Sequence, residues 1–227
     1  MLGRDHVRLA GRIASFLELS SSERKSLYAG TVAPDRERGR GESHHTRKKF
    51  KIWDELVETR FCLNKGLKEK AASHLGTSLH FLADSCIKSG TAHDAIEEML
   101  AEKVFIFPEI PVLSLKNLYG KIMEIRPAED LDLIMQNVSY GGFLTAFHAY
   151  RRTAPAPEDL LDRRAAGKIF VLKMIISLCL FSLFFFLDTA PAFFMTAPCF
   201  TALFIFSKHP DYWEYRKWFR YGKGTEN

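Results

Sequence analysis

The segment Ser73-His-Leu-Gly-Thr-Ser-Leu-His-Phe-Leu-Ala-Asp-Ser-Cys-Ile87 constrains the architecture more than any other part of this chain. Its apolar composition predicts a buried α-helix. Within it, His80 and Asp84 stand four positions apart, and residues i and i+4 lie on one face of a helix. A buried imidazole and carboxylate each need a partner. The pair therefore predicts either two metal ligands or a core histidine that is hydrogen-bonded to Asp84.

Helical signals surround this segment on both sides. An apolar stripe runs from Val7 to Leu17, and Ser20-Ser-Ser-Glu23 resembles the capping box that begins a second helix. Further helices are predicted at Thr46 to Ala72, at Thr91 or Ala92 to Val104 and at Leu113 to Ile125. A proline-led helix start is predicted at Pro127 to Asp130. Gly141-Gly142 is predicted to interrupt the helical pattern before a last helix at Phe143 to Tyr150. Strand alternation is absent from the sequence. Residues 1–150 are therefore predicted to form an all-α, multi-helix bundle.

The overall composition excludes several classes of protein. A length of 227 residues with 47% hydrophobic content excludes a peptide or a disordered tail. The four cysteines have neither the paired spacing of a zinc ribbon nor the density of a disulfide scaffold, which favours reduced thiols in a cytosol-facing protein. The first residues carry charges and no uninterrupted apolar run, so we expect no secretory signal.

The C-terminal region predicts a membrane anchor. From Ile169 to Leu187 the only charge is Lys173, and a second apolar run ends at Phe206. Because a bilayer core about 30 Å thick takes roughly 20 helical residues, residues 169–207 are predicted to form a two-helix transmembrane hairpin. A basic juxtamembrane linker at 151–168 and a basic aromatic tail at 208–227 flank it, which places both termini on the cytoplasmic side of an integral membrane protein. The alternative is a buried hairpin in the core of a soluble protein.

Ligand-type side chains are concentrated in the first hundred residues. Two pairs have the form His-x-x-x-carboxylate, so each pair can direct an imidazole and a carboxylate at one metal ion. The candidate metal ligands are His6, Asp35, His44, His45, His80, Asp84, His93 and Glu97. This nitrogen and oxygen donor set suits zinc, with manganese or iron as alternatives. His74, His148 and His209 are expected to be ordinary surface or packing residues.

The order of these residues resembles the zinc-dependent phospholipase C family, an all-helical family that is also similar to fungal single-strand nucleases. The motifs that carry the resemblance are Asp5-His6-x-x-Leu-Ala, Leu27-Tyr-x-Gly-x-x-Ala-Pro-Asp35, Ser43-His-His45, Leu75-Gly-x-x-x-His80-Phe-x-x-Asp84 and His93-x-x-x-Glu97. They span roughly residues 1 to 100. Two features depart from the family pattern: Met1 precedes His6 by five residues, and no histidine lies between Asp84 and His93.

The resemblance implies a ligand set and roles for single residues. His6 and Asp84 would serve one zinc ion; Asp35, one of His44 and His45, His80 and Asp84 a second; and His93 with Glu97 a third. Asp84 would then bridge two ions, and Asp35 would be the general base for the attacking water. Asp35 and Asp84 are accordingly the candidate catalytic residues. Two or three ions remain open at this point.

These patterns together predict a membrane-anchored phosphoester hydrolase, with phospholipid head groups as the first substrate class. The segment from Arg36 to Lys51 has seven bases and two acids and can steer phosphate-bearing substrates or contact an anionic leaflet. Nucleic-acid binding is not expected, because this segment lacks interleaved stacking aromatics. Two alternatives are an HD-type phosphohydrolase built around His93-Asp94 and a non-catalytic membrane protein with a structural metal site. The oligomeric state is left open.

Overall fold

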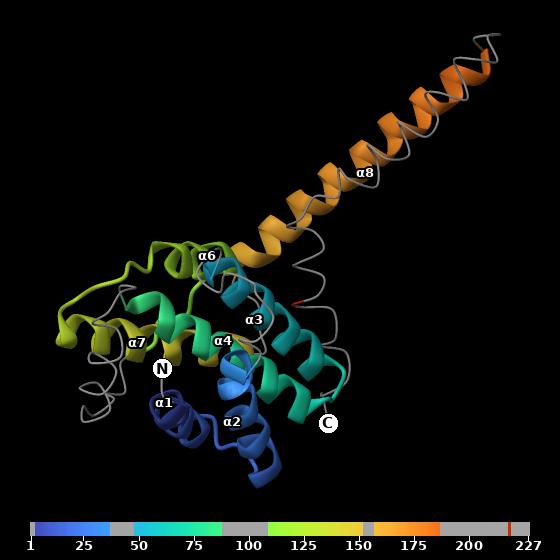
Figure 1. Ribbon diagram of the computed structural model, residues 1–227. Helices are drawn as coiled ribbons and strands as arrows, with labels where there is room; N and C mark the ends of the chain where they lie inside the picture. The colour runs from blue at the N-terminus through green and yellow to red at the C-terminus, as the bar shows by residue number, and fades with distance from the viewer. Residues whose placement is uncertain (1–2, 37–47, 88–108, 152–156, 187–217, 219–227) are drawn as a thin grey trace. The chain divides into compact units, whose positions relative to one another are not determined.

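The computed structural model describes residues 3–36, 48–87, 109–151, 157–186 and Trp218, and these residues are mostly helical (Figure 1). One compact unit contains α1 (Gly3–Phe16), α2 (Ser21–Arg36), α3 (Lys48–Asn64), α4 (Lys68–Cys86), α6 (Leu115–Glu124), α7 (Leu131–Ala146) and the π-helical segment η2 (Phe147–Arg151). A second unit begins at Pro157 with α8 (Pro157–Phe186). In the described part of the chain the β-structure is limited to one isolated bridge, Ile87 with Ala128. The all-α prediction is confirmed for these residues.

Helix α4 is the centre of the first unit. It packs against α2 and α3 most extensively and also contacts α1 and α7 (Figure 1). Its core side chains Leu75, Leu79 and Leu82 are completely buried. The predicted burial of the segment from Ser73 to Ile87 is therefore confirmed, and its apolar side chains are what bring the neighbouring helices together.

Two glycines allow α2 and α4 to touch backbone to backbone. A Cβ atom on Gly30 would lie 2.0 Å from the carbonyl oxygen of Ser73, and one on Gly76 would lie 2.2 Å from that of Leu27. Real Cβ contacts are never this short, so no other residue fits at either position. The hydroxyl of Thr77 donates to the Gly30 carbonyl at 3.2 Å, which adds a polar bond to the contact. These interactions fix the relative position of the two helices.

The predicted capping box at the start of α2 is confirmed. The Ser20 backbone amide donates to Oε2 of Glu23 at 2.9 Å, and the Glu23 amide donates to Oγ of Ser20 at 3.4 Å. The hydroxyl of Tyr150 in η2 donates to Oε1 of the same carboxylate at 2.6 Å. One buried glutamate thus caps α2 and also connects it to the far end of the unit.

The predicted helix from Thr46 to Ala72 is wrong in its C-terminal boundary. Helix α3 ends at Asn64, and α4 begins at Lys68. Gly66 has a φ of +74°, and the amides of Gly66 and Leu67 donate to the carbonyls of Leu63 and Cys62. This is a Schellman motif, which ends a helix where a glycine adopts the left-handed conformation.

Two further boundaries also differ from the prediction. Gly141 and Gly142 do not interrupt a helix, because α7 continues through them to Ala146. A Cβ atom on Gly142 would lie 3.2 to 3.3 Å from Ile13 and Leu9 of α1, so this glycine serves close packing. Helix α7 does not begin at Pro127 either: Asp130 is its N-cap and accepts from the Leu133 amide at 2.8 Å.

The C-terminal predictions are tested only in part. Residues 157–168, predicted as a linker, form the start of α8 in the same continuous helix as the apolar segment that follows. No helix within the described ranges is both long enough and apolar enough to cross a membrane. The second half of the predicted hairpin and the helix predicted from Thr91 or Ala92 to Val104 lie outside the described residues. The transmembrane hairpin therefore stays a prediction.

Candidate metal centre

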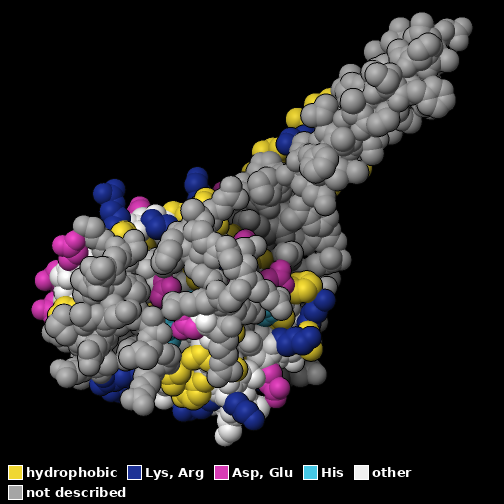
Figure 2. Space-filling view, viewed as in Figure 1, with side chains coloured by type: hydrophobic (Ala, Val, Ile, Leu, Met, Phe, Trp, Pro, Cys, Tyr) yellow, Lys and Arg dark blue, Asp and Glu magenta, His cyan; other side chains and the backbone are white. Residues whose placement is uncertain are grey.

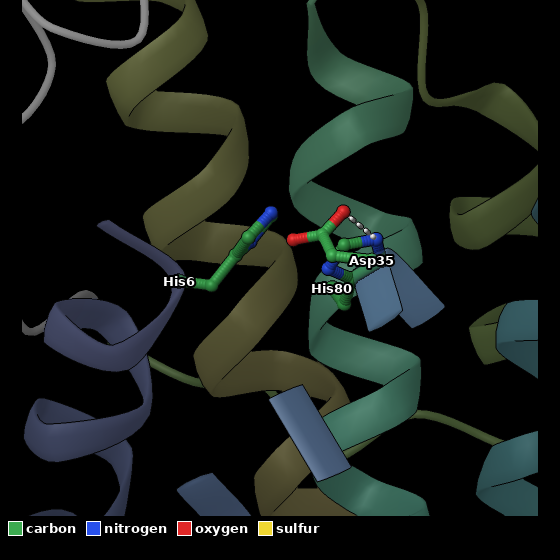
Figure 3. A group of neighbouring side chains, drawn as sticks. All are labelled: His6, Asp35 and His80. Carbon is green, nitrogen blue, oxygen red and sulfur yellow. Dashed lines mark ion pairs between the residues drawn. The ribbon is translucent and has the colours of Figure 1, made fainter. Parts of the chain in front are cut away.

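Three helices that are distant in sequence bring His6, Asp35 and His80 together. His6 lies in α1, Asp35 near the end of α2 and His80 in α4, and Figure 3 shows the three side chains converging on a common point. Their ligand atoms all lie within 4.8 Å of one another. The structure thus brings three of the predicted ligands together, and their binding of a metal stays a prediction.

The contact between α2 and α4 orients the ring of His80. Nδ1 of His80 lies 3.0 Å from the backbone carbonyl oxygen of Thr31, one residue after Gly30. A carbonyl oxygen can only accept, so Nδ1 carries the proton and Nε2 is left as an acceptor with a free lone pair. A backbone carbonyl that fixes the tautomer of a histidine in this way is the usual support of a metal-ligating imidazole.

The distances from the imidazole nitrogens of His80 and His6 to the carboxylate oxygens are longer than hydrogen bonds. Nε2 lies 3.8 Å from Oδ1 of Asp35 and 3.6 Å from Oδ2 of Asp84, and Nε2 of His6 lies 3.5 Å from Oδ1 of Asp84. Hydrogen bonds between nitrogen and oxygen are about 2.7 to 3.2 Å long. Ligands at about 2.0 to 2.1 Å from a tetrahedral zinc ion are about 3.3 Å apart. The observed spacing therefore fits a shared cation better than direct bonding.

The cluster is buried, and His6 shows the physical cost of that burial. His6, His80 and Asp84 are 0%, 2% and 7% exposed, and the two histidine rings have centroids 4.2 Å apart. Neither ring nitrogen of His6 has a hydrogen-bond partner among the residues that the structure describes. An imidazole buried without such a bond is destabilising by roughly 1 to 3 kcal/mol. A cation at the centre of the group would satisfy Nε2, so the donor set fits a metal ion.

The electrostatics of the cluster keep the imidazole of His80 neutral. Burial lowers the pKa of His80 to about 4, with a further lowering by the neighbouring His6, although Asp84, Asp35 and the Thr31 carbonyl act in the opposite direction. At neutral pH the ring is therefore in the form that binds a metal. The two carboxylates provide the negative charge that a divalent cation needs.

The remaining predicted ligands are not tested. His44, His45, His93 and Glu97 lie outside the described residues, as does His209. In the alternative without a metal, His80 is bonded to Asp84; Nε2 of His80 lies 3.6 Å from Oδ2 of Asp84, while Nδ1 bonds to Thr31.

Other histidines and cysteines of this unit lie outside the cluster. His148 is a packing residue, as predicted, because Nδ1 donates to the Leu144 carbonyl and Nε2 accepts from the Leu113 amide, both at 2.9 Å. His74 pairs with Glu55 of α3 at 2.7 Å. The thiol of Cys86 is fully buried, and burial raises its pKa to about 12.

Sequence reasoning missed the contribution of Thr31. Its role comes from a backbone oxygen, which has no residue-type signature. The only signal in the sequence is indirect, in the glycines at positions 30 and 76 that let α2 approach α4 closely enough for the bond to form. Comparison with protein-family models, with curated proteins and with solved structures finds no match to this chain.

Proposed function

We propose that this chain is a metal-dependent phosphoester hydrolase in which His6, Asp35, His80 and Asp84 hold a divalent cation, with zinc as the first choice. The observation that carries the proposal is the convergence of ligand atoms from α1, α2 and α4 within 4.8 Å. Two further observations support it: the nitrogen to oxygen distances of 3.5 to 3.8 Å and the absence of a hydrogen bond to either ring nitrogen of His6 within the described residues.

The two carboxylates have distinct tasks in the proposed reaction. A bound divalent cation supplies positive charge that offsets the charge of a phosphoester and lowers the pKa of a coordinated water. Asp35, whose side chain is 18% exposed with both carboxylate oxygens buried, accepts the proton of the attacking water. The carboxylate of Asp84 lies within 3.6 Å of Nε2 of both His6 and His80, and it supplies negative charge next to the buried imidazoles.

The burial of the cluster favours one competing function, a structural metal site. Structural zinc sites have closed ligand sets, whereas catalytic sites keep a position for water. His6 and His80 are almost completely buried, and Asp35 has both carboxylate oxygens buried although its side chain is 18% exposed. The difference between the two functions is therefore whether a water molecule reaches the cation beside Asp35.

The substrate class is part of the same proposal. Phosphodiesters come first, and among them phospholipid head groups, because the sequence predicts a membrane anchor and a basic segment from Arg36 to Lys51 next to Asp35. The HD-type alternative depends on His93 and Asp94, which lie outside the described residues.

The deciding experiment measures metal content and turnover on the same preparations. Wild type, His80→Ala and the control His74→Ala would be purified, dialysed against zinc and analysed for bound metal, and hydrolysis of bis(p-nitrophenyl) phosphate would then be measured. We expect metal and turnover in wild type and in the control, and neither in His80→Ala. Folded wild type without metal would contradict the metal centre. Stoichiometric metal with no turnover of phosphodiesters, together with no water at the metal by pulsed electron paramagnetic resonance after replacement by manganese, would favour the structural role.

A further inference from the structure

The described part of α8 presents a continuous set of exposed apolar side chains. Six residues of the two turns that follow Lys168 are between 41% and 56% exposed. They are Ile169, Val171, Leu172, Met174, Ile175 and Ile176. Figure 2 shows hydrophobic and basic side chains next to each other on this helix. Soluble monomers seldom expose contiguous apolar surface of this kind, so something covers it.

These side chains cover more of the helix circumference than a single packing face. Successive residues of an α-helix are rotated by about 100°, so these six side chains spread over roughly 220° of the helix circumference. Phe170 and Lys173, which are half-buried, occupy the remaining sector. A partner helix covers an apolar stripe on one side only. Lipid acyl chains surround a helix and so cover all six, while the long side chain of Lys173 can reach back to the head groups.

The charges at the start of α8 are arranged for a negatively charged surface. The acidic residues Glu158, Asp159 and Asp162 come first, and the basic residues Arg163, Arg164 and Lys168 follow directly before the apolar segment. All three bases are exposed. Basic side chains at the border of an apolar segment lie at the depth of lipid head groups, and anionic head groups attract them.

We propose that the apolar segment from Ile169 to Ile176 inserts into an anionic lipid bilayer and that Arg163, Arg164 and Lys168 contact its head groups. The inference rests on the exposure and charge order of α8 and not on the metal centre, so the failure of one leaves the other standing. Insertion requires contact with acyl chains and does not depend on whether the helix crosses.

Vesicle flotation of the full chain tests this inference. The protein would be produced by cell-free synthesis in the presence of vesicles of phosphatidylcholine, with or without an equal amount of phosphatidylserine, and then floated through a density gradient. Vesicle-bound protein floats, whereas aggregates sediment. We expect wild type to float, with more protein on the vesicles that contain phosphatidylserine. The variant Leu172→Ser/Ile175→Ser/Ile176→Ser should bind at least about tenfold more weakly, because three apolar side chains no longer enter the acyl region.

Two matched variants and one alternative occupant complete the test. Val112→Ser/Leu133→Ser removes exposed apolar side chains from the first unit, 65% and 46% exposed, and should float as wild type does. Arg163→Gln/Arg164→Gln/Lys168→Gln should lose the preference for phosphatidylserine. Equal flotation of wild type and the triple serine variant would overturn the proposal. So would wild type that stays lipid-free as a dimer which the serine variant dissociates, because a second copy would then be the occupant.

Discussion

The fold buries the imidazole of His6 without giving its ring nitrogens a hydrogen bond within the described residues. Oδ1 of Asp84 lies 3.5 Å from Nε2. His148 is the opposite case, since it is equally buried but both of its nitrogens are hydrogen-bonded. Natural proteins keep a costly polar group in the core when it has a task, and ligand binding is one such task.

This contrast predicts opposite effects of the same substitution. Without metal, His6→Leu should unfold at the same urea concentration as wild type or a higher one, because an unsatisfied polar group is removed. His148→Leu should be destabilised by about 2 kcal/mol, since the Leu113 amide loses its acceptor. Metal binding should be lost in His6→Leu and kept in His148→Leu. A strongly destabilised metal-free His6→Leu would show that His6 stabilises the fold itself.

His74 predicts a pH dependence of stability that is separate from the metal centre. The hydrogen bond to Glu55 raises the pKa of His74, as do the charges of Glu55 and Glu58, against an opposing effect of burial. A pKa that folding raises stabilises the protein below the ordinary histidine pKa, and this contribution is lost as the pH rises through the folded-state value. With the His74 side chain 37% exposed, the effect is under about 1 kcal/mol.

Urea unfolding at about pH 6 and about pH 8 measures this contribution. Wild type should lose more stability over this interval than Glu55→Gln, in which His74 lacks its charged partner. Equal losses in the two proteins would contradict the role assigned to the pair.

Among the helices, the pair α2 and α4 controls the geometry of the site. Their backbones meet at Gly30 and Gly76, and the His80 bond to the Thr31 carbonyl lies one residue beyond that contact. Any separation of the two helices would therefore move Asp35 away from His80 as well.

Substitution of Gly30 by alanine should separate these helices. A Cβ atom would overlap the Ser73 carbonyl, so we expect Gly30→Ala to lower the free energy of unfolding by about 3 kcal/mol or more. Gly120→Ala in α6 is the matched control, because nothing lies within 4 Å of its Cβ position. The control should be neutral or more stable by up to about 1 kcal/mol, as alanine is the better helix former. Thermal melts followed by circular dichroism distinguish the two, and similar melts would refute a backbone contact at Gly30.

The elements that sequence reasoning predicted well are those with local causes. The capping box at Ser20 to Glu23 and the buried run in α4 depend on residues a few positions apart, and the structure has both. The proximity of His6, Asp35 and His80 also agrees with the sequence pattern, since imidazoles and carboxylates are recognisable by type; their binding of a metal stays a proposal. The distances between these side chains depend on how the three helices pack, which the sequence pattern does not contain.

The predictions that failed depend on distant partners or on a single backbone conformation. The helix interruption predicted at Gly142 is wrong because the contacts of this glycine, Leu9 and Ile13, lie more than a hundred positions away in the sequence. The end of α3 depends on Gly66 adopting a positive φ, which composition does not distinguish from a tolerated glycine within a helix. Tertiary contacts decide such cases, and no local pattern contains them.

For the molecule as a whole, a metal ion held by His6, His80 and Asp84 would join α1 to α4. Binding to the folded state alone stabilises a protein, by about 2.7 kcal/mol at a free ligand concentration a hundred times Kd. We expect saturating zinc to raise the melting temperature of the metal-free protein by roughly 5 to 10 °C. A chelator should reverse the shift, and His80→Ala should show none. A zinc-dependent shift of equal size in His80→Ala would place the bound ion elsewhere.

The distribution of the proposed ligands over α1, α2 and α4 also has a consequence for the synthesis of the protein. A chain leaving the ribosome displays position 6 early and position 84 late, so a complete coordination sphere exists only after the fourth helix has emerged. The proposed ion could therefore bind only once α4 has emerged. Until then α1 is held by its apolar side chains alone, among which Leu9 and Ile13 are buried in the core.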